Sequence, residues 1–130
     1  MKPQVLKEVI KKEYTKCAKD PVYFLKKYCV VQHPMKGKVP FHLYEYQEKA
    51  LGTFEEERFN IILKARQLGL STLTAGYSLW MMTFGQDKNI LVIATKQDTA
   101  KNLVTKVRVM HANLPSWLKQ KCTEDNKLSL

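Results

Sequence analysis

Residues 59–72 read FNIILKARQLGLST, and this stretch decides the fold that the sequence predicts. Residues 59–63 are mostly apolar and β-branched, which is typical of a short buried strand. A basic turn follows and contains a single glycine, Gly69. Residues 71–84 then place apolar side chains at helical spacing. The order therefore predicts a strand, a tight loop and a helix.

The loop between this strand and this helix has features of a phosphate-binding loop. Such a loop surrounds phosphates with backbone N–H groups and with the positive end of a helix dipole. Gly69 permits close approach of the backbone. Ser71 stands at the helix start, where its hydroxyl is a candidate ligand for Mg²⁺, and Thr72 lies beside it. The candidate phosphate-loop residues are Lys64, Ala65, Arg66, Gln67, Leu68, Gly69, Leu70, Ser71 and Thr72.

The loop departs from the usual G-x-x-x-x-G-K-[ST] pattern at two positions. Leu70 stands where the lysine is expected, and Lys64 stands where the first glycine is expected. Because leucine cannot neutralise a phosphate, the charge must come from Lys64 or from Arg66. Lysine would act as a point charge, and arginine as a bidentate clamp or transition-state sensor. An ordinary strand, turn and helix with a basic turn is the alternative interpretation.

The remaining patterns predict further helices and one more strand. Asp20-Pro21 is a helix cap followed by a first-turn proline. Thr95 and Asp98 have the spacing of a capping box. Helices are expected over 3–19, 21–28, 42–54, 71–84 and about 95–113, a loop over 33–40, and a buried strand over 89–94. Strands alternating with helices predict an α/β fold with a parallel sheet and right-handed crossovers.

Charge and composition narrow the class of protein. The net charge is +10, and residues 1–38 hold ten lysines against three acidic residues. This favours a polyanionic partner such as DNA, although a solvated helical face explains the same pattern. No apolar run reaches the ~20 residues that cross a bilayer. Cys17, Cys29 and Cys122 are widely spaced, which favours a reduced compartment and gives little support to a zinc site.

Several short motifs in one order resemble the large terminase subunit of tailed bacteriophages. The resemblance covers about residue 20 to the end of the chain. Its motifs are residues 20–24, 39–41, 43–47, 65–72, 94–96, 99–100 and 114–117.

The resemblance implies an ATP-driven motor that moves double-stranded DNA into procapsids. It implies a P-loop NTPase fold of the additional-strand, RecA/helicase-like class, with residues 1–40 as a basic helical extension and 41–130 as the first part of the ATPase domain. The expected partners are double-stranded DNA, the portal protein, the small terminase subunit and further copies of the chain, with no membrane. The expected location is the host cytoplasm, transiently at the procapsid portal and not in the mature virion.

The resemblance also implies roles for single residues. Tyr46 and Gln47 match a motif that reads the adenine edge of ATP, although packing within a helix also explains Tyr46. Lys64 and Arg66 match positions that carry the catalytic charge, and Ser71 matches the Mg²⁺ ligand. Residues 94–96 resemble a coupling motif, for which a plain helix cap is the alternative. ATP and Mg²⁺ are the implied cofactors.

Two acidic features of such a motor have no counterpart in the sequence. No apolar strand ends in Asp-Glu, which would hold Mg²⁺ and polarise water, and the nuclease carboxylates are absent. We therefore expect a fragment or one part of a split gene that binds nucleotide but does not hydrolyse it alone. The alternatives are a fragment of a helicase-like translocase and a non-catalytic DNA-binding or assembly module.

Overall fold

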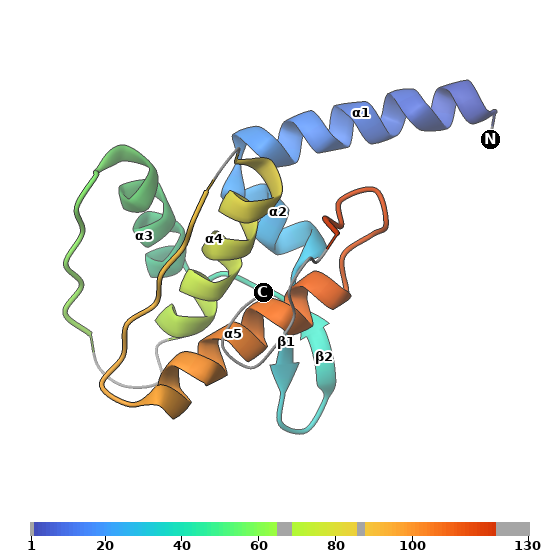
Figure 1. Cartoon of the computed structure of the whole chain (residues 1–130). Helices are drawn as coiled ribbons and strands as arrows, with labels where there is room; N and C mark the ends of the chain where they lie inside the picture. Colours follow the sequence, from blue (N-terminus) through green and yellow to red (C-terminus); the bar gives the residue numbers. More distant parts are fainter. Residues whose placement is uncertain (1, 65–68, 86–87, 122–130) are drawn as a thin grey trace.

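The computed structural model describes residues 2–64, 69–85 and 88–121. Its helices are α1 (Pro3–Lys19), α2 (Pro21–Tyr28), α3 (Glu45–Glu56), α4 (Leu70–Phe84) and α5 (Gln97–Ala112). Its strands are β1 (Val30–His33) and β2 (Gly37–Pro40). Figure 1 shows α4 in the middle of the molecule, with the β1–β2 hairpin and the free half of α1 projecting from it.

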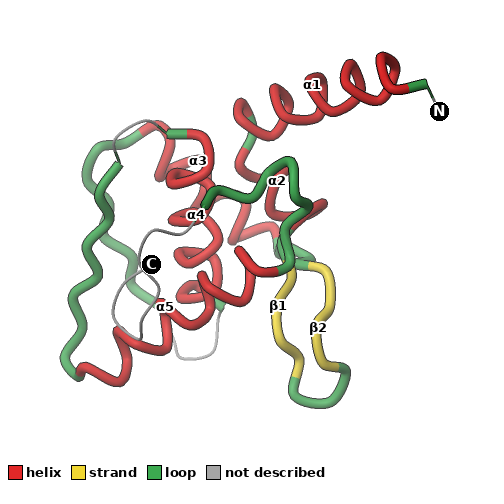
Figure 2. Tube along the Cα trace, turned by 45° about the vertical axis from the view of Figure 1, so that its right-hand side comes forward, coloured by secondary structure: helices red, strands yellow, loops and turns green. Residues whose placement is uncertain are grey.

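The fold differs from the predicted parallel-sheet P-loop NTPase, and that prediction is wrong. The described part of the chain is mainly helical, and its only sheet is the antiparallel pair β1–β2. Figure 2 shows the same arrangement, with helices occupying most of the trace and one short ladder at its edge. No described helix is long and apolar enough to cross a membrane.

The two expected buried strands are extended segments outside any ladder among the described residues. Ile61 and Leu63 are each fully exposed, and Leu91 is 83% exposed. A strand becomes regular only when its backbone pairs with a neighbour, and apolar composition alone cannot supply that neighbour. Residues 59–63 and 89–94 are apolar, but the prediction that they form buried strands is wrong.

The expected loop over 33–40 is instead the turn and the second strand of a β-hairpin, with the last residue of the first strand. β1 and β2 pair antiparallel, with Val31 opposite Val39 and His33 opposite Gly37. Gly37 has a φ of 72°, which glycine adopts without steric cost. In the turn, the His33 ring nitrogen Nδ1 accepts hydrogen bonds from the backbone N–H groups of Met35 and Lys36. Residues 34–36 thus form a tight turn, and Gly37 begins the second strand.

The helices follow their predicted periodicity closely, whereas their caps agree only in part. The Asp20 carboxylate accepts hydrogen bonds from the N–H groups of Val22 and Tyr23, which confirms the predicted cap of α2. The capping box predicted at Thr95 is wrong. Helix α5 begins after Lys96, and no side chain caps it.

Helix α4 packs against its neighbours through large side chains and one close approach. Leu73 and Leu79 are buried within it. The Trp80 indole N–H donates to the carbonyl of Cys17 at 2.8 Å and joins α4 to the end of α1. At Gly76 the helix meets α2 so closely that an added Cβ would clash with Leu25. The core is thus assembled around α4.

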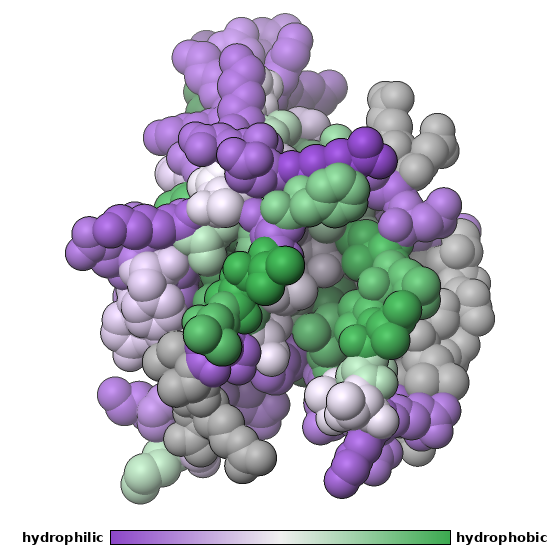
Figure 3. All heavy atoms as spheres, turned by 90° about the vertical axis from the view of Figure 1, so that its left-hand side faces the viewer, coloured by the Kyte–Doolittle hydropathy of each residue, from purple (hydrophilic) through white to green (hydrophobic). Residues whose placement is uncertain are grey.

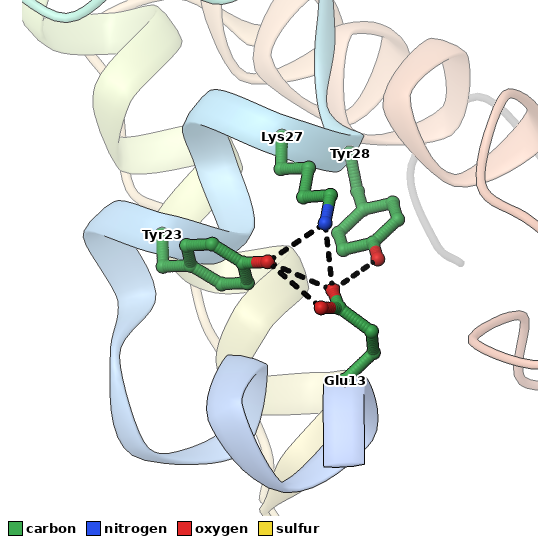
Figure 4. A network of polar contacts seen from close by, with 4 residues as sticks. All are labelled: Glu13, Tyr23, Lys27 and Tyr28. Atoms are coloured by element: carbon green, nitrogen blue, oxygen red, sulfur yellow. Dashed lines mark hydrogen bonds and ion pairs between the residues drawn. The ribbon is translucent and has the colours of Figure 1, made fainter. Parts of the chain in front are cut away.

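The end of α1 is fixed to α2 by a polar network around Glu13 (Figure 4). The Glu13 carboxylate accepts hydrogen bonds from the hydroxyls of Tyr23 and Tyr28, the latter at 2.6 Å. The Lys27 ammonium adds an ion pair at 3.0 Å. Together these contacts lower the pKa of Glu13 to about 2, with the Tyr28 hydroxyl as the largest cause. A charged carboxylate is therefore the form that holds the two helices together.

We expect acid to weaken this junction in a defined range of pH. The folded pKa of Glu13 lies below its ordinary value of 4.5, so its stabilisation is complete above pH 4.5 and is lost as pH falls toward 2. In Glu13→Gln the unfolding temperature should be lower at neutral pH and should fall less steeply in acid. Thermal unfolding followed by circular dichroism measures both slopes. Glu8→Gln, on the exposed part of α1, is the control, and parallel slopes for wild type and Glu13→Gln would contradict the assignment.

Two glycine substitutions test the close approach of α2 and α4. Gly76→Ala should reduce the free energy of unfolding by about 1–3 kcal/mol, because the new methyl group overpacks the contact with Leu25. Gly52→Ala, in α3, meets nothing within 4 Å and should stabilise by about 0.5–1 kcal/mol. Chemical denaturation measures both values, and equal effects of the two substitutions would rule out the packing explanation.

Candidate functional site

The start of α4 carries the residues that the sequence singles out. Gly69 is the N-cap residue, with φ 70° and ψ 15°, and its carbonyl accepts the first bond of the helix from Leu73 N–H at 3.0 Å. No side chain caps this end, and no acidic residue lies in its first turn. The N–H groups at a helix start lack intrahelical acceptors and form the positive end of the helix dipole. This end of α4 is therefore favourable for an anion.

The structure brings the predicted base-reading motif to the predicted phosphate loop. Gln47 is 3% exposed, and its Oε1 accepts a hydrogen bond from Tyr44 N–H at 2.9 Å. Its Nε2 donates to the carbonyl of Gly69 at 3.4 Å. The Gln47 side chain therefore ties the start of α3 to the start of α4. Its role in reading a nucleotide base stays a prediction.

Tyr46 lies beside this junction and faces solvent. Its ring is stacked on that of Tyr44, with centroids 5.6 Å apart and planes 9° from parallel. Tyr46 is 41% exposed, so part of the ring is available to a ligand. Stacked aromatic rings of this kind offer a flat, partly apolar platform.

A cavity of about 730 Å³ opens between α3, the extended segment 57–64 and the first residue of α4. It unites three residues that the sequence predicts for the site: Tyr46, Lys64 and Leu70. Its other lining residues are Lys49, Ala50, Thr53, Phe54, Glu57, Phe59, Asn60, Ile61, Ile62 and Leu63. The cavity thus combines an aromatic ring and two lysines with an apolar wall.

The other predicted residues lie in different places. Ser71 is exposed in the first turn of α4. Thr72 lines a second cavity of about 170 Å³ with residues of β1 and α5. Ala65, Arg66, Gln67 and Leu68 lie outside the described residues.

The expected Mg²⁺ ligand has no cluster of metal-binding side chains around it in the described ranges. Among these residues, no group of three or more histidine, cysteine, aspartate or glutamate side chains is placed to hold a metal. The assignment of Ser71 as a Mg²⁺ ligand stays a prediction, because Mg²⁺ bound with a nucleotide takes most of its ligands from phosphate and water.

Sequence reasoning missed part of the cavity. Lys49, Thr53 and Glu57 line it but match no motif. They follow Tyr46 at steps of three or four residues, which places them on one face of α3 and its extension. This spacing was the signal that marks them as neighbours of Tyr46.

The comparison with known protein families gives no assignment: no family model matches the chain.

The contact between Gln47 and Gly69 should be a measurable part of the stability. Gln47→Ala removes a buried amide that is bonded to both helix starts, and we expect it to cost about 1–3 kcal/mol. Gln4→Ala, on the exposed part of α1, is the matched control and should cost little. Urea denaturation measures both changes. A cost for Gln47→Ala that equals the control would show that the junction does not hold the two helices.

Proposed function

We propose that the chain is a nucleotide-binding segment of a viral DNA-packaging motor of the large-terminase type. The observation that carries this proposal is the cavity at the start of α4. It contains Tyr46 and Lys64, which were assigned to nucleotide binding by their sequence motifs, and it adds Lys49. The proposal rests on this cavity and on the motif order, and not on a parallel sheet.

The cavity has a size and chemistry that suit a nucleotide. Ligand sites commonly enclose about 300–1,000 Å³ and combine apolar walls with a few polar groups. The cavity, at about 730 Å³, falls within this range. In the proposed complex a base stacks near the exposed face of Tyr46, while Lys49 and Lys64 neutralise phosphates as point charges. The start of α4 adds its dipole on the same side.

The proposal separates binding from hydrolysis. Glu57 is the acidic residue in the lining of the cavity, and no second carboxylate lines the cavity among the described residues. Hydrolysis of ATP needs groups that hold Mg²⁺ and polarise water. In the proposed motor those groups, the portal protein, the small terminase subunit and double-stranded DNA act together with this segment. Lys64 and Arg66 remain the candidates for the catalytic charge.

One observation favours a second function, a DNA-binding or assembly module. Helix α1 projects from the molecule, and its residues from Pro3 to Val9 are exposed. Its lysines Lys7, Lys11 and Lys12 are exposed as well. Lysines of this kind bind phosphates with loss of counterions, so such binding weakens as salt increases. This second function does not require the cavity.

Titration of the chain with a fluorescent ATP analogue tests the proposal. The double variant Lys49→Ala and Lys64→Ala should bind about tenfold more weakly or worse, since each tenfold corresponds to ~1.4 kcal/mol. Tyr46→Ala should weaken binding as well. Lys12→Ala and Lys19→Ala, which remove the same charge from α1, form the matched control and should bind as wild type.

The outcomes distinguish the two functions. If the double variant of Lys49 and Lys64 binds the analogue as tightly as wild type, the nucleotide does not bind in the cavity. If the analogue does not bind and duplex DNA binds with strong salt dependence, the DNA-binding module replaces the motor segment. Unfolding temperatures of all variants verify that the fold is intact.

A further inference from the structure

The β1–β2 hairpin projects from the molecule with its turn directed away from the body (Figure 1). Every residue from 32 to 38 is exposed, whereas Val31 and Val39 at the base are half-buried. The turn is fixed by His33, whose Nδ1 accepts hydrogen bonds from two backbone N–H groups. The hairpin is therefore a pre-formed arm that can bind a partner with little loss of conformational entropy.

One face of the hairpin continues onto α5. Gln32 and Lys38 are opposite each other in the ladder, so their side chains lie on the same face. Gln32 also lines the second cavity, of about 170 Å³, together with Thr105 and Lys106 of α5. We call the surface made by the exposed residues Gln32, Lys36, Lys38, Thr105 and Lys106 the basic surface.

The basic surface lies where two stretches of the chain without acidic residues meet. Residues 21–44 contain the hairpin, residues 99–121 contain all of α5 after Asp98, and neither stretch holds any of the twelve acidic residues. These are Glu8, Glu13, Asp20, Glu45, Glu48, Glu55, Glu56, Glu57, Asp87, Asp98, Glu124 and Asp125, of which Asp87, Glu124 and Asp125 lie outside the described residues. Asp98, in the first turn of α5, stands about 12 Å along the helix from Lys106.

The three lysines of the basic surface have no carboxylate partner within the described ranges. The ion pairs found there lie on other elements and join Lys26 to Glu48, Lys27 to Glu13 and Lys49 to Glu45. Lys36, Lys38 and Lys106 therefore keep their charge uncompensated. Uncompensated cations gathered on one side of a protein favour a polyanionic partner.

The chemistry of this surface favours a nucleic acid over a protein or a lipid. Met35, at the turn and 91% exposed, is the only exposed large hydrophobic residue on the described hairpin and α5. A protein interface has an apolar centre, and a helix that lies on a membrane has an apolar face. Unpaired bases stack on aromatic rings, but no Phe, Tyr or Trp lies in 30–40 or 97–112. A double helix is therefore favoured over a single strand.

The hairpin has dimensions that suit the major groove of DNA. This groove is about 12 Å wide and about 8.5 Å deep, and it admits a two-stranded ribbon. Paired strands lie about 4.8 Å apart, and three residue steps place the turn about 10 Å beyond Val31. The major groove of duplex RNA is too narrow for side chains to enter. The hairpin therefore fits duplex DNA better than duplex RNA.

The basic surface is separate from the candidate nucleotide cavity. In Figure 1, α3 and segment 57–64 lie on the left of the molecule, and the hairpin lies at the lower right. Figure 3 views that left side, where hydrophobic side chains gather in two groups. The two cavities share no lining residue. A ligand on one surface therefore leaves the other accessible.

We propose that the β1–β2 hairpin enters the major groove of duplex DNA while Lys106 of α5 contacts the phosphate backbone beside it. Lys36 and Lys38 bind phosphates at the edges of the groove, and the Gln32 amide faces the base edges. The proposal rests on the role of double-stranded DNA in the proposed function, and it assigns that role to a surface.

Titration of a fluorescently labelled DNA duplex of two helical turns, at several salt concentrations, tests this surface. The triple variant Lys36→Ala, Lys38→Ala and Lys106→Ala should bind at least about tenfold more weakly, and its slope of log affinity against log salt should be shallower by about 2–3. The matched control Lys7→Ala, Lys11→Ala and Lys12→Ala removes the same charge from α1 and should change the slope by less than about one. All six lysines are exposed, so unfolding temperatures should stay near that of wild type.

Chemical footprinting identifies the groove. Dimethyl sulfate methylates guanine N7, which lies in the major groove, and adenine N3, which lies in the minor groove. Wild type should protect guanine N7 from methylation, and the triple variant of the hairpin and α5 should lose this protection.

Three results would overturn the proposal. The first is DNA binding by the triple variant that equals wild type, and a loss confined to the α1 control would place the DNA site on α1. The second is tighter binding to duplex RNA, to single-stranded DNA or to vesicles of phosphatidylserine and phosphatidylcholine than to duplex DNA at the same salt. The third is protection of adenine N3 alone. The ATP-analogue titration depends on other residues, so the nucleotide site and this surface fail separately.

Discussion

The close approach of α2 and α4 at Gly76 is the contact on which the rest of the structure depends. Gly76 leaves room beside α4 for the side chain of Leu25, with which an added Cβ would clash. Helix α4 also contacts the other helices of the core. Toward its end, α4 holds α1 through Trp80 and the ring of Phe84, which lies 5.1 Å from that of Tyr14. Midway along its length α4 meets α3, where the Tyr77 hydroxyl donates to the Glu55 carboxylate at 2.8 Å. The candidate site is therefore positioned by helix packing and not by a sheet.

Helices and extended segments differed in how far the sequence could predict them. A helix satisfies its backbone within itself, so its apolar stripe and caps are local signals, and Asp20 marked the start of α2 correctly. A strand depends on a neighbour that may come from any part of the chain. The hairpin of β1 and β2 was missed because the Pro and Gly residues of 33–40 were interpreted as a loop. The prediction that residues 59–63 form a buried strand was wrong. Apolar composition indicates that burial of a segment would be favourable, but it does not show that the chain supplies a surface to bury it.

The candidate site was predictable to the extent that it rests on short motifs. Gln47 and Gly69 were singled out separately, and they meet in the structure through one side-chain hydrogen bond. Lys49 and Thr53 were not singled out, because their contribution arises from their shared face of α3 and from the distance between α3 and segment 57–64. That distance depends on how the helices pack, and a search for motifs cannot predict it. The helical spacing from Tyr46 predicts only that Lys49 and Thr53 lie on the same face of α3 as Tyr46.

Segment 59–64 forms one wall of the cavity, and this has an energetic consequence for binding. Ile61, Ile62 and Lys64 all line the cavity, although the Ile61 side chain is fully exposed. Fixing the backbone of one residue costs about 1–2 kcal/mol in conformational entropy. Among the described residues, no ladder hydrogen bonds offset that cost in this segment. A ligand in the cavity therefore orders this segment as it binds. The conformational entropy lost in this ordering reduces the affinity of the cavity for its ligand.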